Sequence, residues 1–231
     1  MKSYIYPDKV TENFDNADLH IKYCLSFIKK YLSGNLLEVG AGCGSFTRHY
    51  LNKNIKKILL TERDKKNIFL LKKKFKKNKK IIVTKKLIHQ INKKFDVILY
   101  IHVLEHIKND KKELFHAISK LKKNGYLIIL VPAHQKIFSN LDYLVGHHRR
   151  YEINFFKKKI YKSNLVFAKY LDSIGYMLYY LNKIFFKNEK FPSKLKIFIW
   201  DKFFTPFTII IDFLLRYTFG KAILAIYKKN D

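Results

Sequence analysis

The chain is 231 residues long, 48% of it is hydrophobic, and its formal net charge is +29. This composition excludes an intrinsically disordered protein and is sufficient for one large folded domain. Two cysteines, Cys24 and Cys43, are too few for a disulfide framework, and the first residues lack the apolar segment of a signal peptide, so a cytoplasmic protein is expected.

The positive charge comes mainly from lysine, since only five of the 47 basic residues are arginine. Nucleic-acid contacts draw on arginine because its planar guanidinium donates two hydrogen bonds in a fixed geometry. The nine lysines between residues 65 and 80 are typical of an exposed helix face. The charge therefore does not predict a nucleic-acid partner.

Seven short apolar runs alternate with amphipathic stretches, which is the pattern of β-α units on a parallel sheet. The strands that we predict cover residues 35–40, 56–62, 80–84, 95–101, 125–131, 164–171 and 222–229. The expected fold class is α/β, with a doubly wound, mostly parallel seven-stranded sheet. Residues 1–34 are expected to form an N-terminal helical cap. In the helix predicted before the fifth strand, Asp110 and Glu113 are placed for a capping box and Gly125 for the end.

The first predicted strand ends in a glycine-rich turn, EVGAGCG, at residues 38–44. Three of the chain's eight glycines lie here, where they let the chain turn sharply and let a ligand approach the backbone. The second strand ends at Glu62, 18 residues after Gly44. A carboxylate at this position accepts hydrogen bonds from both hydroxyl groups of a ribose, so the two features together predict a nucleoside-containing cofactor.

These stretches, LLEVGAGCGSFT and then LLTERD, resemble the class I S-adenosylmethionine-dependent methyltransferases. FDVILYIHVLEHI and LKKNGYLIILVPA are similar to the fourth and fifth strands of the ubiquinone-biosynthesis type, so the resemblance covers residues 30–150. It implies that residues 35–231 form a methyltransferase domain with S-adenosyl-L-methionine as cofactor. The cofactor-binding residues that it implies are Glu38, Gly40, Gly42, Gly44, Glu62 and Arg63, with Ile101 and His102 beside the methionine end.

One family feature is missing at the end of the third strand. The family usually has Asp or Asn there, near the adenine amino group, whereas this sequence reads VTKKLIHQ. Lys85 and Lys86 cannot accept a hydrogen bond from that group. The adenine contact is therefore expected from backbone groups or from Gln90.

HVLEH, residues 102–106, fits the H-x-x-E-H pattern of a group of zinc peptidases. It follows a predicted buried strand, however, and does not lie on a long helix with a downstream glutamate ligand. Some methyltransferases of the ubiquinone type hold a divalent cation at this turn, but they carry an acidic residue where His102 stands. No metal is therefore expected, and Glu105 and His106 are expected to open the next helix.

The segment after the fifth strand, PAHQKIFSNLDYLVGHHRRYEINFF, begins at the carboxyl end of the sheet, where open α/β proteins place their sites. We predict His134 and His148 as candidate general bases and Arg149 as the residue that orients an anionic group of the acceptor. The alternative is that the His-His pair caps a helix and that the Arg-Arg pair is solvated.

This segment also resembles the VPAH...LDYxxGHxRRY segment of a methyltransferase subgroup linked to cell-surface glycan or lipid pathways. The resemblance implies a small-molecule, lipid-linked or glycan acceptor. One rival is an RNA methyltransferase, which the charge favours but which lacks support from an N-P-P-Y-type motif after the fourth strand. The other is a non-catalytic protein that binds S-adenosylmethionine or a partner, which the glycine turn and Glu62 do not exclude.

Residues 176–219 form a long insertion before the last strand and hold 14 of the chain's 37 aromatic residues. The insertion is too short, and too interrupted by Pro206 and Asp212, for a transmembrane helix. We expect it to be helical, either as a lid packed on its own core or as a surface that binds the acceptor or a membrane interface. The second alternative places the protein peripherally at the inner face of the membrane.

Overall fold

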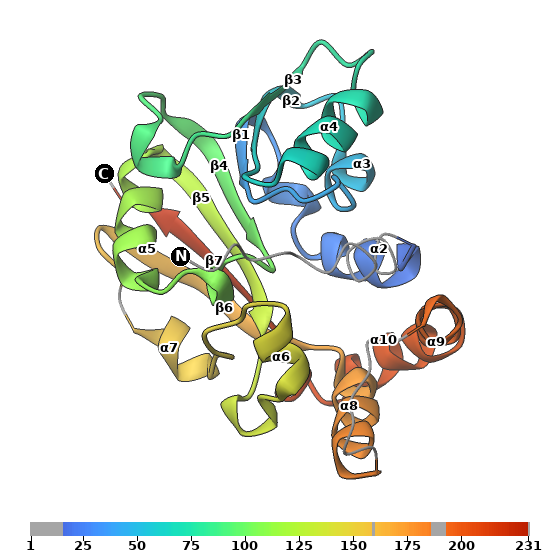
Figure 1. Cartoon of the computed structure of the whole chain (residues 1–231). Helices are drawn as coiled ribbons and strands as arrows, with labels where there is room; N and C mark the ends of the chain where they lie inside the picture. The colour runs from blue at the N-terminus through green and yellow to red at the C-terminus, as the bar shows by residue number, and fades with distance from the viewer. Residues whose placement is uncertain (1–15, 159, 186–192, 231) are drawn as a thin grey trace.

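A seven-stranded sheet in the order β3-β2-β1-β4-β5-β7-β6 crosses the protein in the computed structural model, which describes residues 16–158, 160–185 and 193–230 (Figure 1). The strands are β1 (Gly34–Val39), β2 (Ile55–Thr61), β3 (Ile81–Thr84), β4 (Phe95–Ile101), β5 (Leu121–Pro132), β6 (Ser163–Leu171) and β7 (Ala222–Lys229). The first five strands are parallel, and β7 runs antiparallel to both β5 and β6. The predicted doubly wound, mostly parallel sheet is therefore confirmed.

Helices cover both faces of this sheet. They are α2 (Asp18–Ser26), α3 (Thr47–Tyr50), α4 (Lys65–Lys74), α5 (Asp110–Ser119), α6 (Asn140–Leu144), α7 (Ile153–Lys157), α8 (Ser173–Phe185), α9 (Lys194–Ile199) and α10 (Thr205–Leu214), with the shorter turns η1 (Lys29–Tyr31), η2 (Ile88–Gln90), η3 (Leu104–His106) and η4 (Gln135–Ile137) and the π-helical turn η5 (Trp200–Phe204). Neighbouring residues of a strand point to opposite faces. Leu36 accordingly joins the core under α2 and α4, while Leu37 joins the core under α5 and α7 (Figure 1).

Two local predictions around α5 are wrong. Asn109 is the residue that caps the helix, because its side chain accepts a hydrogen bond from Lys112 N, so Asp110 lies inside the first turn. Gly125 does not end the helix but lies within β5, where a Cβ atom would come within 2.9 Å of Asp96 O. The strand therefore begins directly after the helix, and the glycine is needed where the backbone of β4 approaches closely.

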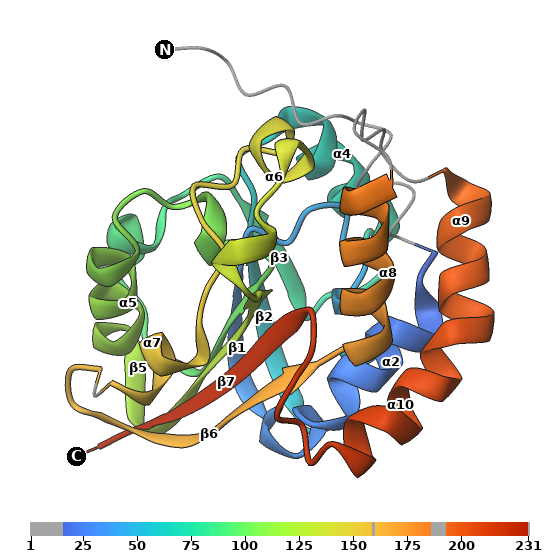
Figure 2. The ribbon, with the colours of Figure 1, turned by 90° about the horizontal axis from the view of Figure 1, so that it is seen from below.

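The insertion before β7 consists of α8, α9, η5 and α10, so the prediction of a helical insertion is confirmed for the part of residues 176–219 that the structure describes. Two fully buried carboxylates anchor it. Asp201 accepts hydrogen bonds from the backbone N–H groups at the start of α2, and Asp212 accepts from Tyr23 OH of α2 and from the backbone at the start of α8. Figure 2 shows α10 beside both α2 and α8 as a result. Of the predicted cap over 1–34, residues 1–15 lie outside the described part of the chain, and the domain limits stay a prediction.

Candidate functional site

The glycine turn after β1 is built from three residues with left-handed backbone angles. Gly40, Gly42 and Gly44 have φ values of 66°, 55° and 81°. A Cβ atom on Gly40 would lie 2.7 Å from Val103, and one on Gly44 would lie 2.7 Å from Phe75, so both glycines are required by packing. A Cβ atom on Gly42 would meet nothing within 4 Å. Gly42 therefore borders open space in which a ligand can approach the backbone.

The carboxylate of Glu62 lies against this turn. Its Oε2 atom accepts a hydrogen bond of 2.8 Å from Gly42 N, and its Oε1 atom accepts from Arg63 N at 2.7 Å and from Asp64 N at 2.9 Å. These three backbone donors hold the carboxylate at the tip of β2, beside the open space at Gly42. The structure thus brings together the two features that predict ribose binding, while the side chain of Arg63 is exposed and its cofactor contact stays a prediction.

Glu38 supports the turn from below. Its buried Oε2 atom accepts hydrogen bonds from Thr47 Oγ1 and Tyr50 OH, both of 2.6 Å, which fasten α3 to β1. Burial raises the pKa of the Glu38 carboxyl group to about 7. The side chain therefore stabilises the helix that follows the glycine turn, and its contact with a cofactor stays a prediction.

The end of β4 lies at the same edge of the sheet as the glycine turn, since Val39 pairs with Tyr100. Ile101 is buried, and His102 follows it with a left-handed φ of 54° and an exposed ring. The His102 ring lies 6.5 Å from the ring of Phe46, which follows the turn. These two residues are therefore placed where the methionine end of the cofactor is predicted.

On the adenine side, Lys85 and Lys86 are exposed at the end of β3, and Gln90 Oε1 accepts a hydrogen bond from Leu87 N. The Gln90 carbonyl oxygen thus already supports the local turn, which leaves backbone groups as the simpler candidates for an adenine contact.

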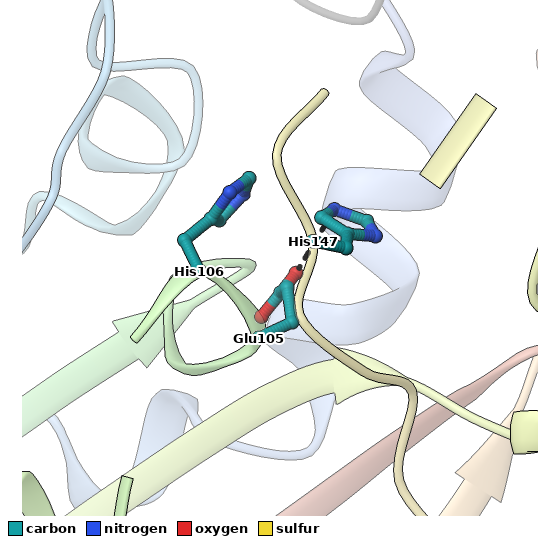
Figure 3. A group of neighbouring side chains, drawn as sticks. All are labelled: Glu105, His106 and His147. Atoms are coloured by element: carbon teal, nitrogen blue, oxygen red, sulfur yellow. Dashed lines mark ion pairs between the residues drawn. The ribbon is translucent and has the colours of Figure 1, made fainter. Parts of the chain in front are cut away.

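Within HVLEH, Leu104–His106 form the single turn η3, which ends before α5 begins, so the expectation that Glu105 and His106 open the next helix is wrong. Glu105 is fully buried, and Figure 3 shows its carboxylate between the rings of His106 and His147. Burial acts to raise the pKa of Glu105, but the imidazoles of His102, His147 and His106 outweigh it and lower that pKa below its usual value. Local sequence reasoning missed His147 because this residue comes from the segment after β5.

His134 lies in an aromatic pocket at the end of β5. Its ring is stacked on Tyr170 at a centroid distance of 4.8 Å and contacts Tyr176 of α8 edge-on at 5.0 Å. Burial lowers the pKa of its imidazole, with Glu152 acting in the opposite direction. The ring is thus held in the neutral form that a general base needs near pH 7. Its catalytic role stays a prediction.

The remaining predicted residues are placed differently. The His148 side chain is exposed, while its backbone N donates a hydrogen bond to Glu105 O. The guanidinium of Arg149 donates to Asp110 Oδ2 at 2.5 Å and to Lys108 O at 2.8 Å, so it fastens this segment to the start of α5. Roles of His148 and Arg149 toward an acceptor stay predictions.

The alternative interpretation of this segment, in which both arginines are solvated, is wrong for Arg150. It is buried, its Nε atom donates to both oxygens of Asp142 at 2.9 and 3.0 Å, and its guanidinium lies 4.5 Å from the ring of Tyr179. Tyr179 OH also donates to Asp142 Oδ2. This cluster joins the segment after β5 to α8, so Arg150 has a structural role that differs from that of Arg149.

Comparisons with known proteins agree with this geometry. Residues 15–165 match a family described as a methyltransferase domain, whereas no curated protein matches the sequence. The N-methyltransferase NodS from Bradyrhizobium japonicum WM9, solved with S-adenosyl-L-homocysteine, has a TM-score of 0.61 and 14% identity over 98% of this chain and 93% of its own.

Two further solved structures are similar. The plantazolicin methyltransferase BpumL, in complex with S-adenosyl-L-homocysteine, has a TM-score of 0.61 and 16% identity over 99% of this chain and 92% of its own. The third comes from a complex between the Haloferax volcanii Trm112 methyltransferase activator and a methyltransferase. The match has a TM-score of 0.66 and 7% identity, and it covers 100% of this chain and 100% of the matched chain. At identities of 7% to 16%, these similarities show that the fold is shared and nothing more.

We predict that the Glu38 carboxyl group makes the free energy of unfolding of the protein fall as the pH rises from 4.5 to 7. Its pKa of about 7 in the folded protein lies above the ordinary value of 4.5, so the folded state holds the proton more tightly between these values. The stabilisation is complete below pH 4.5 and is lost as the pH rises through 7, by about 3 kcal/mol for a shift of this size. In urea unfolding between pH 4.5 and 8, Glu38→Gln, whose amide oxygen still accepts both hydrogen bonds, should show a smaller fall than the wild type. Parallel curves for the two proteins would contradict the prediction.

Proposed function

Since the chain belongs to the methyltransferase-domain family, we propose that it transfers a methyl group from S-adenosylmethionine to a small-molecule, lipid-linked or glycan acceptor at the inner face of a membrane. Among these acceptors, the exposed side chains of the insertion favour a lipid-linked one. The observation that carries this choice is the outward-facing apolar surface of α9, η5 and α10.

The cofactor fits the residues present at the carboxyl edge of the sheet. Gly42 leaves space for a ligand, and the carboxylate of Glu62, held by three backbone N–H groups, keeps acceptor capacity on Oε2 for a ribose hydroxyl group. Ile101 and His102 would border the methionine end. S-adenosylmethionine supplies an electrophilic methyl group, so the protein's main task is to hold donor and acceptor in line. His134, held neutral, is the base that we propose for an acceptor hydroxyl or amine.

The insertion turns its polar residues inward. Asp201, Thr205, Thr208 and Asp212 are all fully buried. Because residues three and four positions apart share one side of a helix, they form a single stripe that faces α2 and α8. A water-facing helix of a globular protein has the opposite arrangement, with apolar residues inside.

Large apolar side chains occupy the outer side instead, and we call this surface the apolar face. Its members are each between 54% and 68% exposed: Leu195, Phe198, Phe203, Phe207, Ile210, Phe213 and Leu214. Exposed apolar side chains gathered on neighbouring helical turns are characteristic of an interaction site, and aromatic rings favour the boundary between apolar and wet regions. A lid packed on its own core would not leave these rings in water.

Cations lie at both ends of the apolar face. Lys194 and Lys196 lie at its start, and Lys169 and Arg216 line an open depression beside Phe213 at its end. This combination of rings and cations complements anionic lipids, whose phosphate groups attract lysine and arginine while the rings enter the interface. None of the helices in the described ranges is long and apolar enough to cross a membrane. The arrangement therefore supports a peripheral attachment that gives access to a lipid-linked acceptor.

We predict that the protein binds to anionic vesicles, and a flotation assay measures this binding directly. The wild-type chain should float with vesicles of phosphatidylcholine and phosphatidylglycerol at moderate salt, and high salt should release it only in part because apolar insertion is not screened. Replacing Phe203, Phe207 and Phe213 by serine should abolish flotation. The matched control is the double change Phe69→Ser and Phe115→Ser, which removes exposed rings of α4 and α5, outside the insertion, and should leave flotation unchanged. Absence of flotation at every salt concentration, or complete release by salt, would overturn the membrane proposal.

Cofactor binding gives a separate prediction. Glu62→Ala should weaken binding of S-adenosylmethionine by about 1 to 3 kcal/mol, because ribose hydroxyl groups lose their acceptor. Isothermal titration calorimetry measures the change. Asp64→Ala is the matched control, since this neighbouring carboxylate caps α4 and is exposed. Equal affinities of the wild type and Glu62→Ala would remove Glu62 from the cofactor site.

A further inference from the structure

We propose that Glu105, His106 and His147 bind one transition-metal ion of the zinc class. One ligand atom from each residue can be chosen so that all three lie within 4.8 Å of one another (Figure 3). The set joins the turn after β4 to the segment after β5, so the ion would connect two separate parts of the carboxyl edge. This inference departs from the expectation that HVLEH holds no metal.

The Glu105 carboxylate carries the first part of the argument. It is 0% exposed, and neither of its oxygens accepts a hydrogen bond from any residue within the described ranges. The nearest imidazole nitrogens to Oε1 are His102 Nδ1 at 3.6 Å and His147 Nε2 at 3.8 Å. A buried carboxylate without hydrogen bonds is costly unless a charge neutralises it. A bound cation would supply that charge.

The orientation of His147 is the second, independent observation. Its Nδ1 atom lies 2.7 Å from Asp142 Oδ1, and Asp142 is itself held by Arg150. Zinc-bound histidines almost always donate their other ring N–H group to a carboxylate or a carbonyl oxygen in this way. Because a carboxylate can only accept, Nδ1 carries the proton, and Nε2 of the neutral ring, 3.8 Å from Glu105 Oε1, is available as a metal ligand. His106 has a comparable arrangement, because its ring forms a hydrogen bond with the backbone of Gly146.

The spacing and the donor set point to zinc and not to magnesium. Ligand bonds of about 2.0 to 2.2 Å place neighbouring ligands of a tetrahedral zinc ion about 3.4 Å apart. The distance of 3.8 Å between His147 Nε2 and Glu105 Oε1 is close to this value and too long for a hydrogen bond. Two imidazoles and one carboxylate form a common zinc site, whereas magnesium prefers oxygen ligands in an octahedron.

Three protein ligands would leave one position of a tetrahedral ion for water or for an oxygen of the acceptor. The site lies directly after His102, at the edge where the cofactor is proposed to bind. A zinc ion there would lower the pKa of a bound acceptor hydroxyl group. This role rests on the proposed methyl transfer, whereas the binding of the ion does not.

Metal titration of the full chain tests the site without any methyl transfer. After treatment with a chelator and desalting, zinc chloride should bind with one-to-one stoichiometry in calorimetry, and cobalt(II) should give the strong visible absorption of a tetrahedral complex. Glu105→Gln, His106→Ala and His147→Ala should each lower zinc affinity at least 10-fold, and Asp142→Asn, which removes the support of His147, by about 10- to 100-fold.

A matched control comes from another histidine pair. The rings of His89 and His116 lie 6.0 Å apart, away from Glu105, and changing both to alanine should leave the zinc affinity unchanged. Zinc should also raise the melting temperature of the wild type and not that of His147→Ala. Absence of saturable zinc binding, equal affinity in the ligand variants, or equally tight magnesium binding would overturn the proposal. The first result would mean that imidazolium groups alone neutralise Glu105. If S-adenosylmethionine still binds, the proposed function stands in each of these cases.

Discussion

Parallel pairing of β1 with β2 and β4 is the constraint on which the site depends. Val39 pairs with Thr61 on one side and with Tyr100 on the other, so three chain segments leave the sheet at the same edge. The glycine turn, the Glu62 carboxylate and His102 all follow these strand ends directly. Their proximity is therefore a consequence of strand register, and hydrogen bonds from backbone to side chain, such as that from Gly42 N to Glu62 Oε2, then fix the details.

Buried carboxylates perform a second organising task, away from the sheet. Asp201 and Asp212 accept hydrogen bonds from helix starts and from Tyr23, which satisfies backbone N–H groups that a helix cannot pair internally. These contacts require the polar side of α10 to face the protein. The apolar side is consequently directed outward, and the same interactions that hold the insertion in place create its apolar face.

Much of this arrangement could be predicted from residue patterns. Each strand is a short apolar run, and the glycine turn with Glu62 is a local signature, because both depend on residues close together in sequence. The predictions for Asp110 and Gly125 are wrong, because capping depends on side-chain direction and the need for Gly125 comes from the close approach of a neighbouring strand. Helical spacing in 205–214 identifies a helix, but it cannot tell that the polar side is the buried one.

Residues of the segment after β5 were the hardest to place. His147 and Arg150 come together with Glu105 and Asp142 only through the tertiary fold, and the run HHRR itself gives no indication of which side chains are buried. Arg150 is buried while Arg149 is partly exposed, although the two are adjacent. Their tertiary partners decide this difference, because Arg150 contacts the buried Asp142 and Tyr179 whereas Arg149 reaches the start of α5, and residue type alone does not indicate these partners.

Methyl transfer to an acceptor at a membrane is the central claim, and following a labelled methyl group tests it most directly. The chain is incubated with S-adenosylmethionine labelled in the methyl group and with separate pools of membrane lipids, glycans, small metabolites and RNA. The account predicts label in the lipid pool, including lipid-linked glycans, and loss of that label with Glu62→Ala. Label that enters RNA, or no label in any pool from a chain that binds the cofactor, would contradict it.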